Sequence, residues 1–487
     1  MGLVFQAANR NKEARLSYLG ALRNNAQYDE CRITLAKLLV DIREFDEACI
    51  HFEQLRQHNP LKLSYIDAYA KCQLAANDAE AAVALLNEAL QLAPNNEHVH
   101  LNLGVATQQA GNLPKAKTHF ECAIEIRPTF TTAYLNLANL LLQERRIKPA
   151  IAQFEDALRI GDVTAQGHCD YASALILDQN FTAGWQQFEW RLQTPLQASR
   201  LESMAADRQR WPHSQTDATS DVLIYGEQGV GDEVMFASCI DDFITVSNTA
   251  IVLECDTRLQ PLFQRSFQNI RVIERDTSPP ILEHITEYLP IGSLPLFVRQ
   301  TKTDFVTTKP YLIADENDQC KWAERFSVLP NTLNIGLSWR GGKSNVPLQK
   351  SIPLQQLEPL FTQGVNVINM QYGDHQHEVE TFNAQTGCIL HDWNDVDPLI
   401  DIDDQAAQLS QLDLFISVDN STAHLAGALG VKTLLLLPYN ADWRWMQNDT
   451  STLWYPTVTL SRQRQRDSWA DGIQASIQLI STLSGST

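Results

Sequence analysis

The chain lacks the features that mark membrane-spanning, secreted and nucleic-acid-binding proteins. No apolar run reaches the roughly 18 residues that cross a bilayer. The first residues, MGLVFQAANRNKEARLS, show no basic start followed by a long apolar stretch, so we expect no signal peptide. Lys and Arg total 38 against 58 Asp and Glu, a net charge of -20. Such an acidic chain is a poor candidate for binding nucleic acid phosphates or an anionic membrane by bulk charge.

Paired cysteine motifs are also missing. The nine cysteines are scattered, and none forms a C-x-x-C pair or a spacing typical of metal ligands. We therefore expect reduced thiols in a cytoplasmic protein, mostly serving as small core residues. With 487 residues the chain is too long for one hydrophobic core, and about two to four domains are expected.

A repeat of 34 residues runs through the N-terminal third of the chain. Alanine recurs at this spacing, at Ala14, Ala48, Ala82, Ala116 and Ala150. A large side chain follows each alanine, at Tyr18, Phe52, Leu86, Phe120 and Phe154, and prolines close three units at Pro60, Pro94 and Pro128. Gly104 precedes Ala116, which gives a small residue where two helices touch. The pattern resembles the tetratricopeptide repeat, with an ordinary helical bundle as the alternative.

The repeat changes character near residue 184. Gly184 stands in register, and Trp185 and Trp190 in AGWQQFEWRL are typical of a helix that caps the open end of a repeat stack. We therefore assign residues 1–194 to the repeats with their capping helix. Residues 195–220 show no steady period and are predicted to form a connector.

From residue 221 short apolar runs alternate with helical patterns. The runs are VLIY at 222, AIVLE at 250, IRVI at 270, LNIGLSW at 333, VNVINMQ at 365, CIL at 388, DLFISV at 413 and KTLLLLP at 432. This alternation predicts parallel sheets covered by helices on both faces. We expect two Rossmann-like domains, 221–320 and 321–487, the second ending in a C-terminal helix. A ligand is then expected beyond the carboxyl ends of the strands.

Three turns after predicted strands carry polar residues. YGEQGVGDEVMF, at 225, places Asp232 where a glycine-rich turn opens a helix, although a carboxylate there would repel a phosphate. LSWRGGKSN places Arg340 and Lys343 around two glycines, which suits an anion such as a diphosphate or is only a solvated basic turn. SVDNSTAHLAGALG places Asp419 at a strand end and Ser421 and Thr422 as N-caps, either an anion site or plain capping.

One further stretch combines potential metal ligands. In GDHQHEVE, His375 and His377 stand beside Asp374 and Glu378, and two imidazoles on one strand face could share a metal ion. The stretch follows a glycine and is typical of a surface loop, so we expect no metal site there.

These motifs together carry a resemblance. GEQGVGDEVMF, LSWRGGKSN, SVDNSTAHLAGALGVKTLLLLP, and DWRWM with the later WYP are similar to bacterial tetratricopeptide-repeat glycosyltransferases. Their catalytic half resembles the heptosyltransferase-type (family 9) GT-B fold. The layout is similar to O-GlcNAc transferases and to repeat-bearing flagellin glycosyltransferases. The resemblance implies an all-α TPR superhelix followed by an α/β GT-B fold.

The resemblance also implies an inverting transfer of a sugar from a nucleotide-sugar donor to an acceptor, without a metal or other cofactor. Asp232 matches the proposed general base, and Lys343 is the second catalytic candidate. The first loop, with Glu227 as a rival base and Gly229 and Gly231, would serve the acceptor. The donor site would comprise Ser338, Arg340, Lys343, Asp419, Asn420, Ser421, Thr422 and His424. Asn420 stands where the family usually has threonine, and Lys350 where it usually has arginine before SIP, which puts the choice of donor in question.

The repeats are expected to recruit a protein or peptide acceptor. Asn102 and Asn136 occupy one register position, and O-GlcNAc transferases use such an asparagine ladder to bind an extended peptide. A structural preference at that helix position is the alternative. For the whole chain, the alternative function is a non-catalytic scaffold whose GT-B half has lost its chemistry. We also expect residues 221–487 to fold and bind nucleotide without the repeats.

Overall fold

The protein divides into two compact units, Met1–Gly167 (unit 1) and His168–Thr487 (unit 2). A computed structural model describes residues 1–206, 208–212, 221–275, 285–305, 309–330, 333–341, 350–362, 364–393, 395–447 and 450–485. No helix in these ranges combines the length and the apolar character that crossing a bilayer requires.

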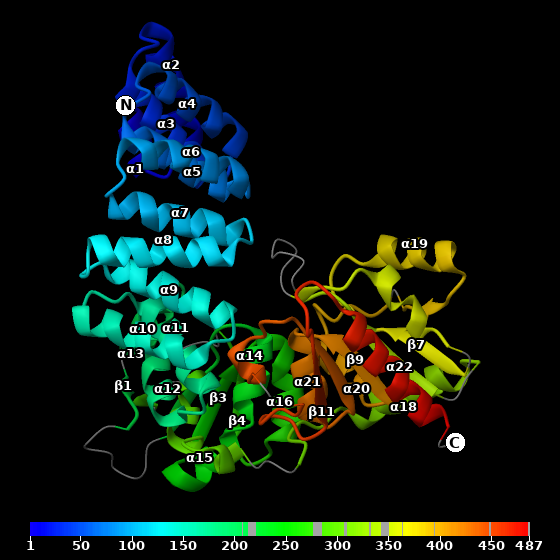
Figure 1. Cartoon of the computed structure of the whole chain (residues 1–487). Helices are drawn as coiled ribbons and strands as arrows, with labels where there is room; N and C mark the ends of the chain where they lie inside the picture. The colour runs from blue at the N-terminus through cyan, green and yellow to red at the C-terminus, as the bar shows by residue number, and fades with distance from the viewer. Residues whose placement is uncertain are drawn as a thin grey trace. The chain divides into compact units, whose positions relative to one another are not determined.

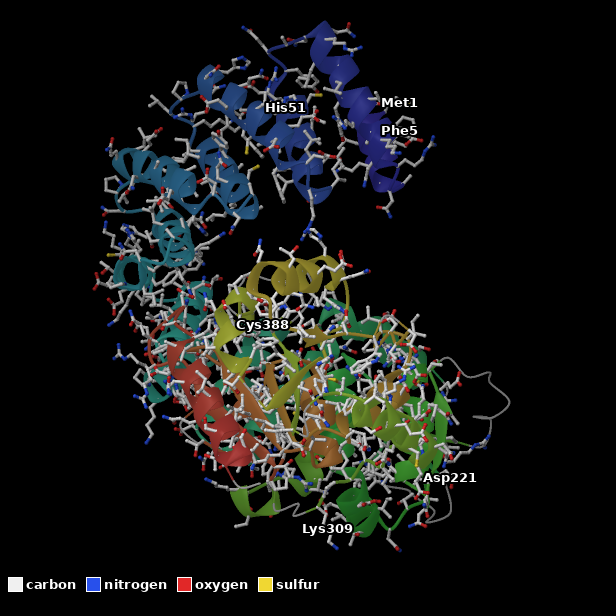
Figure 2. The ribbon with its side chains drawn as sticks, turned by 90° about the vertical axis from the view of Figure 1, so that its right-hand side faces the viewer. Met1, Phe5, His51, Asp221, Lys309 and Cys388 are labelled. Atoms are coloured by element: carbon white, nitrogen blue, oxygen red, sulfur yellow. The ribbon has the colours of Figure 1, made fainter. Side chains whose placement is uncertain are left out.

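Unit 1 is a stack of antiparallel helix pairs (Figure 1). Its helices are α1 (Gly2–Ala7), α2 (Asn11–Asn24), α3 (Asp29–Asp41), α4 (Phe45–His58), α5 (Leu63–Ala75), α6 (Ala79–Leu92), α7 (Glu97–Gln109), α8 (Leu113–Ile126), α9 (Thr131–Gln143) and α10 (Ile147–Ile160). From α3 onward, each pair joins a helix of 13 residues to one of 14. Figure 2 marks Met1, which precedes α1, Phe5 on α1 and His51 among the stacked helices.

The small and large residues of the repeat meet as the sequence predicts. All five repeat alanines are fully buried, and the large side chains that follow them are buried as well. A Cβ added to Gly104 would lie 2.3 Å from Cε1 of Phe120, so the ring needs the space that glycine leaves. The predicted tetratricopeptide-like packing of unit 1 is therefore confirmed.

The turn between the two helices of each repeat uses one left-handed residue. These residues are Asn9, Arg43, Asn77, Gly111, Arg145 and Gln179, with φ between 56° and 81°. Glycine occupies the position only once, although it adopts this conformation at the lowest cost. The residue types therefore hide this feature, and the sequence did not predict it.

Unit 2 contains two parallel sheets. The first has the order β1-β5-β2-β3-β4 and the second β11-β10-β9-β6-β7-β8. The strands are β1 (Gln209–Arg210), β2 (Val222–Tyr225), β3 (Ile251–Cys255), β4 (Arg271–Glu274), β5 (Glu287–Pro290), β6 (Leu333–Ser338), β7 (Val365–Asn369), β8 (Leu390–His391), β9 (Leu414–Val418), β10 (Thr433–Leu437) and β11 (Val458–Arg462). Every described pairing between these strands is parallel, which confirms the predicted α/β class. The sequence did not predict β1, β5 and β11.

Helices surround both sheets. They are α11 (Ala165–Leu177), α12 (Phe181–Phe188), α13 (Pro195–Ala205), α14 (Val230–Ala237), α15 (Ile240–Ser247), α16 (Gln260–Ser266), α17 (Pro295–Val298), α18 (Glu316–Ser327), α19 (Gln376–Thr386), α20 (Ile402–Leu409), α21 (Ser421–Leu429) and α22 (Ala470–Ser484). Short 3₁₀ turns are η1 (Glu189–Gln193), η2 (Thr257–Leu259), η4 (Ile291–Ser293), η5 (Lys302–Phe305), η7 (Leu354–Leu360) and η8 (Trp443–Trp445). The expected C-terminal helix is α22, which packs against η7 and β11.

The segment around Trp185 belongs to unit 2. Trp185 is buried in one core with Phe236 and Trp454, and its Nε1 donates to the carbonyl oxygen of Arg299 at 2.7 Å. The compact units therefore divide at Gly167, earlier than the boundary at 194 that we expected for the repeats. Instead of only capping a stack, α12 completes the core of the α/β unit.

Candidate functional site

A cleft of about 1350 Å³ lies at the carboxyl ends of the strands of unit 2. Its walls come from the segments that follow β2, β3, β6, β7, β8, β9 and β10, so both sheets contribute. The charged residues that line it are Asp232, Arg258, Arg340, Lys350, Asp374, Glu378, Asp419, Asp442 and Arg444, together with His424. Ligands of open parallel sheets bind at this edge, because the loops there are free to vary while the strands hold their ends in place.

The loop after β2 presents Asp232 to the cleft. Gln228 takes the left-handed backbone conformation, with φ of 63°, and Gly229 is the N-cap of α14. No side chain caps this helix, and Asp232 lies within its first turn. A Cβ on Gly231 would lie 3.3 Å from Cα of Ser421, so this glycine allows the first turn of α14 to pack against the first turn of α21.

Arg444 on η8 holds the carboxylate of Asp232. Its Nε and Nη2 donate to the same oxygen, Oδ1, at 2.8 and 2.5 Å, and its Nη1 donates to Oδ1 of Asp442 at 2.7 Å. The side chains of Arg444 and Asp232 are 17% and 18% exposed, so the pair is only partly screened by solvent. Burial works against the charge of Arg444, but the carboxylates of Asp232 and Asp442 raise its pKa overall. Asp232 and Arg444 stand 212 positions apart, and no local pattern predicts this pairing.

Lys350 and Asp419 form a second ion pair in the cleft. Nζ of Lys350 donates to Oδ2 of Asp419 at 2.7 Å, and Nε1 of Trp445 donates to Oδ1 of the same carboxylate at 2.8 Å. Burial opposes the charge of Lys350, yet Asp419 and then Asp442 raise its pKa. Lys350 therefore keeps its charge, and it is a cleft residue that we had noted only as a departure from the family pattern.

The N-terminus of α21 faces the cleft through Asn420 and Ser421. The N-cap is Asn420, whose Oδ1 accepts from the amide of Ala423 at 3.1 Å, so the prediction that Ser421 and Thr422 are the caps is wrong. Nδ2 of Asn420 donates to Oγ of Ser338 at 2.8 Å. Ser338 and Thr422 are both 1% exposed and are absent from the described cleft lining, so they support the wall from behind.

His424 lies one helical turn into α21. Its Nδ1 is 2.8 Å from the hydroxyl of Tyr455, and its ring stacks on Trp445 with centroids 4.7 Å apart. Burial lowers the pKa of His424 to about 4. The imidazole is therefore neutral at pH 7 and forms an uncharged part of the wall.

The loop after β6 brings Arg340 to the cleft. Nη2 of Arg340 donates to the carbonyl oxygen of Asp374 at 2.5 Å, and Nε lies 3.6 Å from the carboxylate of Glu378. A Cβ on Gly341 would lie 2.6 Å from the carbonyl oxygen of Asp419, so glycine allows the loops after β6 and β9 to touch. Lys343 lies outside the described residues.

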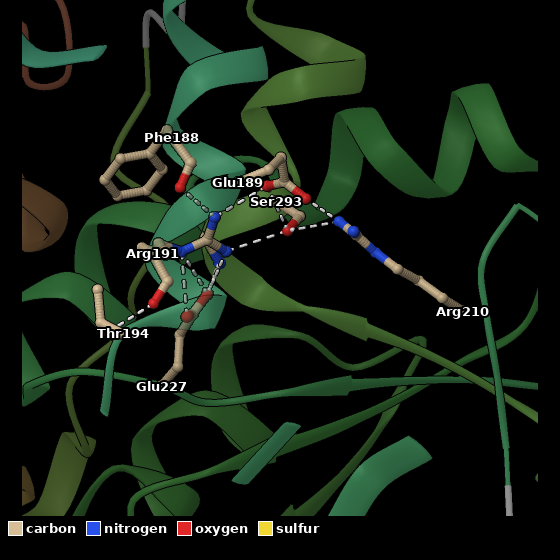
Figure 3. A network of polar contacts seen from close by, with 8 residues as sticks. Phe188, Glu189, Arg191, Thr194, Arg210, Glu227 and Ser293 are labelled. Atoms are coloured by element: carbon tan, nitrogen blue, oxygen red, sulfur yellow. Dashed lines mark hydrogen bonds and ion pairs between the residues drawn. The ribbon is translucent and has the colours of Figure 1, made fainter. Parts of the chain in front are cut away.

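Glu227 does not line the described cleft. Its side chain is fully buried and accepts two bonds from Arg191 at Oε1, from Nη2 at 2.5 Å and from Nε at 3.2 Å (Figure 3). Oε1 also accepts from the amide of Gly292 at 2.9 Å. Arg191 contacts Glu189 and Ser293 as well. The expectation that Glu227 serves the acceptor loop or rivals Asp232 as base is therefore corrected, because its carboxylate joins η1 to the first sheet.

The two asparagines of the proposed peptide groove lie on α7 and α9 and are half-buried. Nδ2 of Asn102 donates to the carboxylate of Asp67 on the preceding repeat. The second N–H and the carbonyl oxygen of the Asn102 amide are then the groups that an extended peptide could use. The structure places Asn136 in the same position of the next repeat.

The described part of the chain holds no group of three or more His, Cys, Asp and Glu residues arranged to bind a metal ion. His375 instead contacts the carboxylate of Asp392 at 3.4 Å. Burial lowers the pKa of His375 and Asp392 raises it, with a net increase. His375 is therefore the partner of Asp392 in an ion pair.

Comparison with family models identifies tetratricopeptide repeats in unit 1. Residues 73–121 and 131–160 each match a model described as tetratricopeptide repeat. The matches fall on the helix pairs that the 34-residue period predicts.

A curated relative extends beyond the repeats. Protein FlbA of Caulobacter vibrioides is 29% identical over 304 residues, which cover 59% of this chain and 50% of FlbA. The chain therefore spans half the length of this relative. Because unit 1 ends at Gly167, an alignment of this length also includes part of unit 2.

Solved structures with some likeness include MamA, PilW and TTC0263. MamA is 19% identical and covers 33% of this chain and 94% of its own, with a TM-score of 0.30. PilW, described as a type IV pilus biogenesis factor, is 17% identical and covers 41% and 94%, with a TM-score of 0.35. TTC0263, a TPR protein of Thermus thermophilus, is 24% identical and covers 36% and 95%, with a TM-score of 0.31. With TM-scores below 0.5, these likenesses support no argument about this chain.

Proposed function

We propose that unit 2 is an inverting glycosyltransferase of the GT-B type, which moves a sugar from a nucleotide-sugar donor to an acceptor. The observation that carries the proposal is the cleft at the carboxyl ends of two parallel sheets, where Asp232 from the side of the first sheet meets Arg444 from the side of the second. Asp232 comes from the loop after β2. Arg340, Lys350 and Arg444 come from the second sheet, as does the N-terminus of α21.

In this reaction the acceptor hydroxyl gives its proton to Asp232 while its oxygen attacks the anomeric carbon of the sugar. The bond between that carbon and the diphosphate oxygen breaks, and its electron pair leaves with the nucleoside diphosphate. Arg340, Lys350 and the amide groups at the start of α21 would offset the charge that develops on the leaving group. Lys343 remains part of the proposal as a further donor-binding cation. One displacement with attack from the far side inverts the anomeric configuration.

The repeats of unit 1 would supply the acceptor. Tetratricopeptide stacks present an extended surface that suits a polypeptide. Asn102 and Asn136 are our proposed contacts, because an amide side chain can pair with a peptide backbone. Replacing both by alanine should weaken binding of a protein acceptor and leave nucleotide binding unchanged. Gln57→Ala, on the exposed surface of α4, is the matched control.

The test begins with the donor. A ligand that binds only the folded state raises the melting temperature, so a thermal-shift screen of UDP, GDP, ADP, TDP and CMP should identify the nucleotide. The matching nucleotide sugars are then incubated with the protein, and sugar release or transfer is measured by mass spectrometry. Nucleotide binding without hydrolysis or transfer would support a non-catalytic scaffold instead.

A further inference from the structure

The cations of the described cleft are already paired with carboxylates. Arg444 contacts Asp232 and Asp442, and Lys350 contacts Asp419. The guanidinium of Arg258 contacts Asp256, and Nε of Arg340 lies 3.6 Å from the carboxylate of Glu378. A diphosphate entering the cleft must therefore compete with protein carboxylates for each of these cations. A cation can exchange its carboxylate for a phosphate most readily if a second contact still holds its side chain after the exchange.

Arg444 is the cation that can change one partner and keep another. Its Nη1 and its backbone amide both bind Oδ1 of Asp442, at 2.7 and 3.1 Å, and its guanidinium lies 4.5 Å from the centre of the Trp443 ring. None of these contacts involves Asp232: the amide holds the backbone of Arg444, and Nη1 holds one corner of its guanidinium. Nε and Nη2, the two groups that bind Asp232, lie on one edge of the rigid guanidinium plane, so they turn together toward another anion when the plane tilts about the Nη1 contact with Asp442.

The contact with Arg444 also restricts Asp232. Both N–H groups donate to Oδ1, and among the described residues no polar contact reaches Oδ2. While Arg444 occupies Oδ1, half of the carboxylate is unavailable to an acceptor hydroxyl. A charge-assisted bond to guanidinium also lowers the tendency of a carboxylate to accept another hydrogen bond.

We infer that Arg444 exchanges Asp232 for the diphosphate of the donor while it remains bound to Asp442, and that this exchange releases the carboxylate of Asp232 to act on the acceptor. The inference rests on the proposed function, and it assigns an order to the reaction, with the donor bound before the acceptor hydroxyl is activated. No covalent bond changes in the exchange, and the guanidinium keeps its proton throughout. Arg444 is thus a positioning residue for Asp232 and a contact for the donor.

The exchange predicts an unusual effect on binding. Asp232→Asn removes the carboxylate that competes for Arg444, so the nucleoside diphosphate found in the screen should bind about three- to tenfold more tightly to the full chain. Asp232→Ala should show the same gain in affinity, and it replaces Asp232→Asn in the experiment if that variant folds poorly. Arg444→Gln should weaken binding about tenfold, and the gain from Asp232→Asn should disappear in the Arg444→Gln background.

Asp374→Asn is the matched control. Asp374 also lines the cleft, and in the described part of the chain its carboxylate forms no ion pair, so its loss removes one negative charge without freeing a cation. Binding to the control should change less than twofold when measured by titration calorimetry. A gain in Asp232→Asn no larger than that of Asp374→Asn, or one that persists without Arg444, would overturn the exchange. If wild type and all variants bind none of the nucleoside diphosphates nor pyrophosphate, the proposed function itself fails, and the exchange fails with it.

Discussion

Asp232 connects the two sides of the cleft. It lies in α14, which follows β2 of the first sheet, and it is bound by Arg444 in η8, which follows β10 of the second sheet. If it is the general base, Asp232→Asn keeps the shape and removes the basic oxygen. Turnover should then fall about 100- to 10,000-fold, the usual worth of general base catalysis, without weaker donor binding. Single-turnover transfer with saturating donor measures this effect.

Glu227→Gln provides the comparison for Asp232. Glu227 is buried against Arg191, so its substitution should lower the melting temperature. The rate of transfer per folded molecule should stay close to that of wild type. A folded Asp232→Asn protein that keeps more than about a tenth of the wild-type rate would show that the carboxylate is not the base.

His424 gives the stability of unit 2 a dependence on pH. In the folded protein burial lowers its pKa from 6.5 to about 4. As the pH falls from 6.5 toward 4, the unfolded chain takes up a proton that the folded chain does not. Stability therefore falls by up to about 1.4 kcal/mol per pH unit in this window. His424→Gln lacks this proton uptake. The melting temperature of the variant minus that of wild type should therefore increase as the pH is lowered from 7 to 5. An unchanged difference would mean that the imidazole is not held neutral.

At the scale of the element, the left-handed residue in each repeat turn can be tested by a reciprocal exchange. Arg43 has φ of 64° and is exposed, and Gly111 has φ of 81° and no atom within 4 Å of the place that a Cβ would take. Arg43→Gly should stabilise unit 1 by about 0.5–1 kcal/mol, and Gly111→Ala should destabilise it by about 1 kcal/mol. Urea unfolding followed by circular dichroism measures both variants. Shifts of the same sign in both would show that backbone strain does not decide the effect.

The sequence predicted those elements whose signals are local. The period of 34 fixes the helix pairs, because small and large residues must meet at each contact, and buried strands appear as apolar runs. The missed strands β5 and β11 are EYLP and VTLSR, in which charge, proline and polar residues hide the pattern. Asp232 and Asp419 were found because each follows an apolar run.

Contacts between distant segments were beyond local reasoning. Arg444 became part of the candidate site only through its bond to Asp232, although the motif DWRWM was visible. Glu227 was misplaced for the same reason, because its partner Arg191 precedes the first sheet in the chain. Composition and spacing report which residues a loop holds, but they do not report which way each side chain points.

At the scale of the whole molecule, the structure revises the fragment that should fold alone. Residues 221–487 lack Trp185, which fills the core, and Arg191, which neutralises the buried Glu227. Removing one partner of a buried ion pair costs about 3–5 kcal/mol. Residues 168–487 should therefore give a folded protein that binds nucleotide, whereas residues 221–487 should be insoluble or unfolded. Expression, circular dichroism and the thermal-shift screen compare the two fragments. A stable, nucleotide-binding 221–487 fragment would show that α12 and η1 are dispensable.

The constant helix lengths of unit 1 make its size adjustable in whole steps. In every repeat from α3 to α10 the two helices have the same combined number of residues, and the left-handed residue of the turn occupies the same position. A duplication or loss of 34 residues therefore leaves the spacing of all other repeats unchanged. If the stack binds an extended polypeptide, as we propose, the length of polypeptide that it contacts should change by an equal increment with each repeat, while unit 2 stays the same.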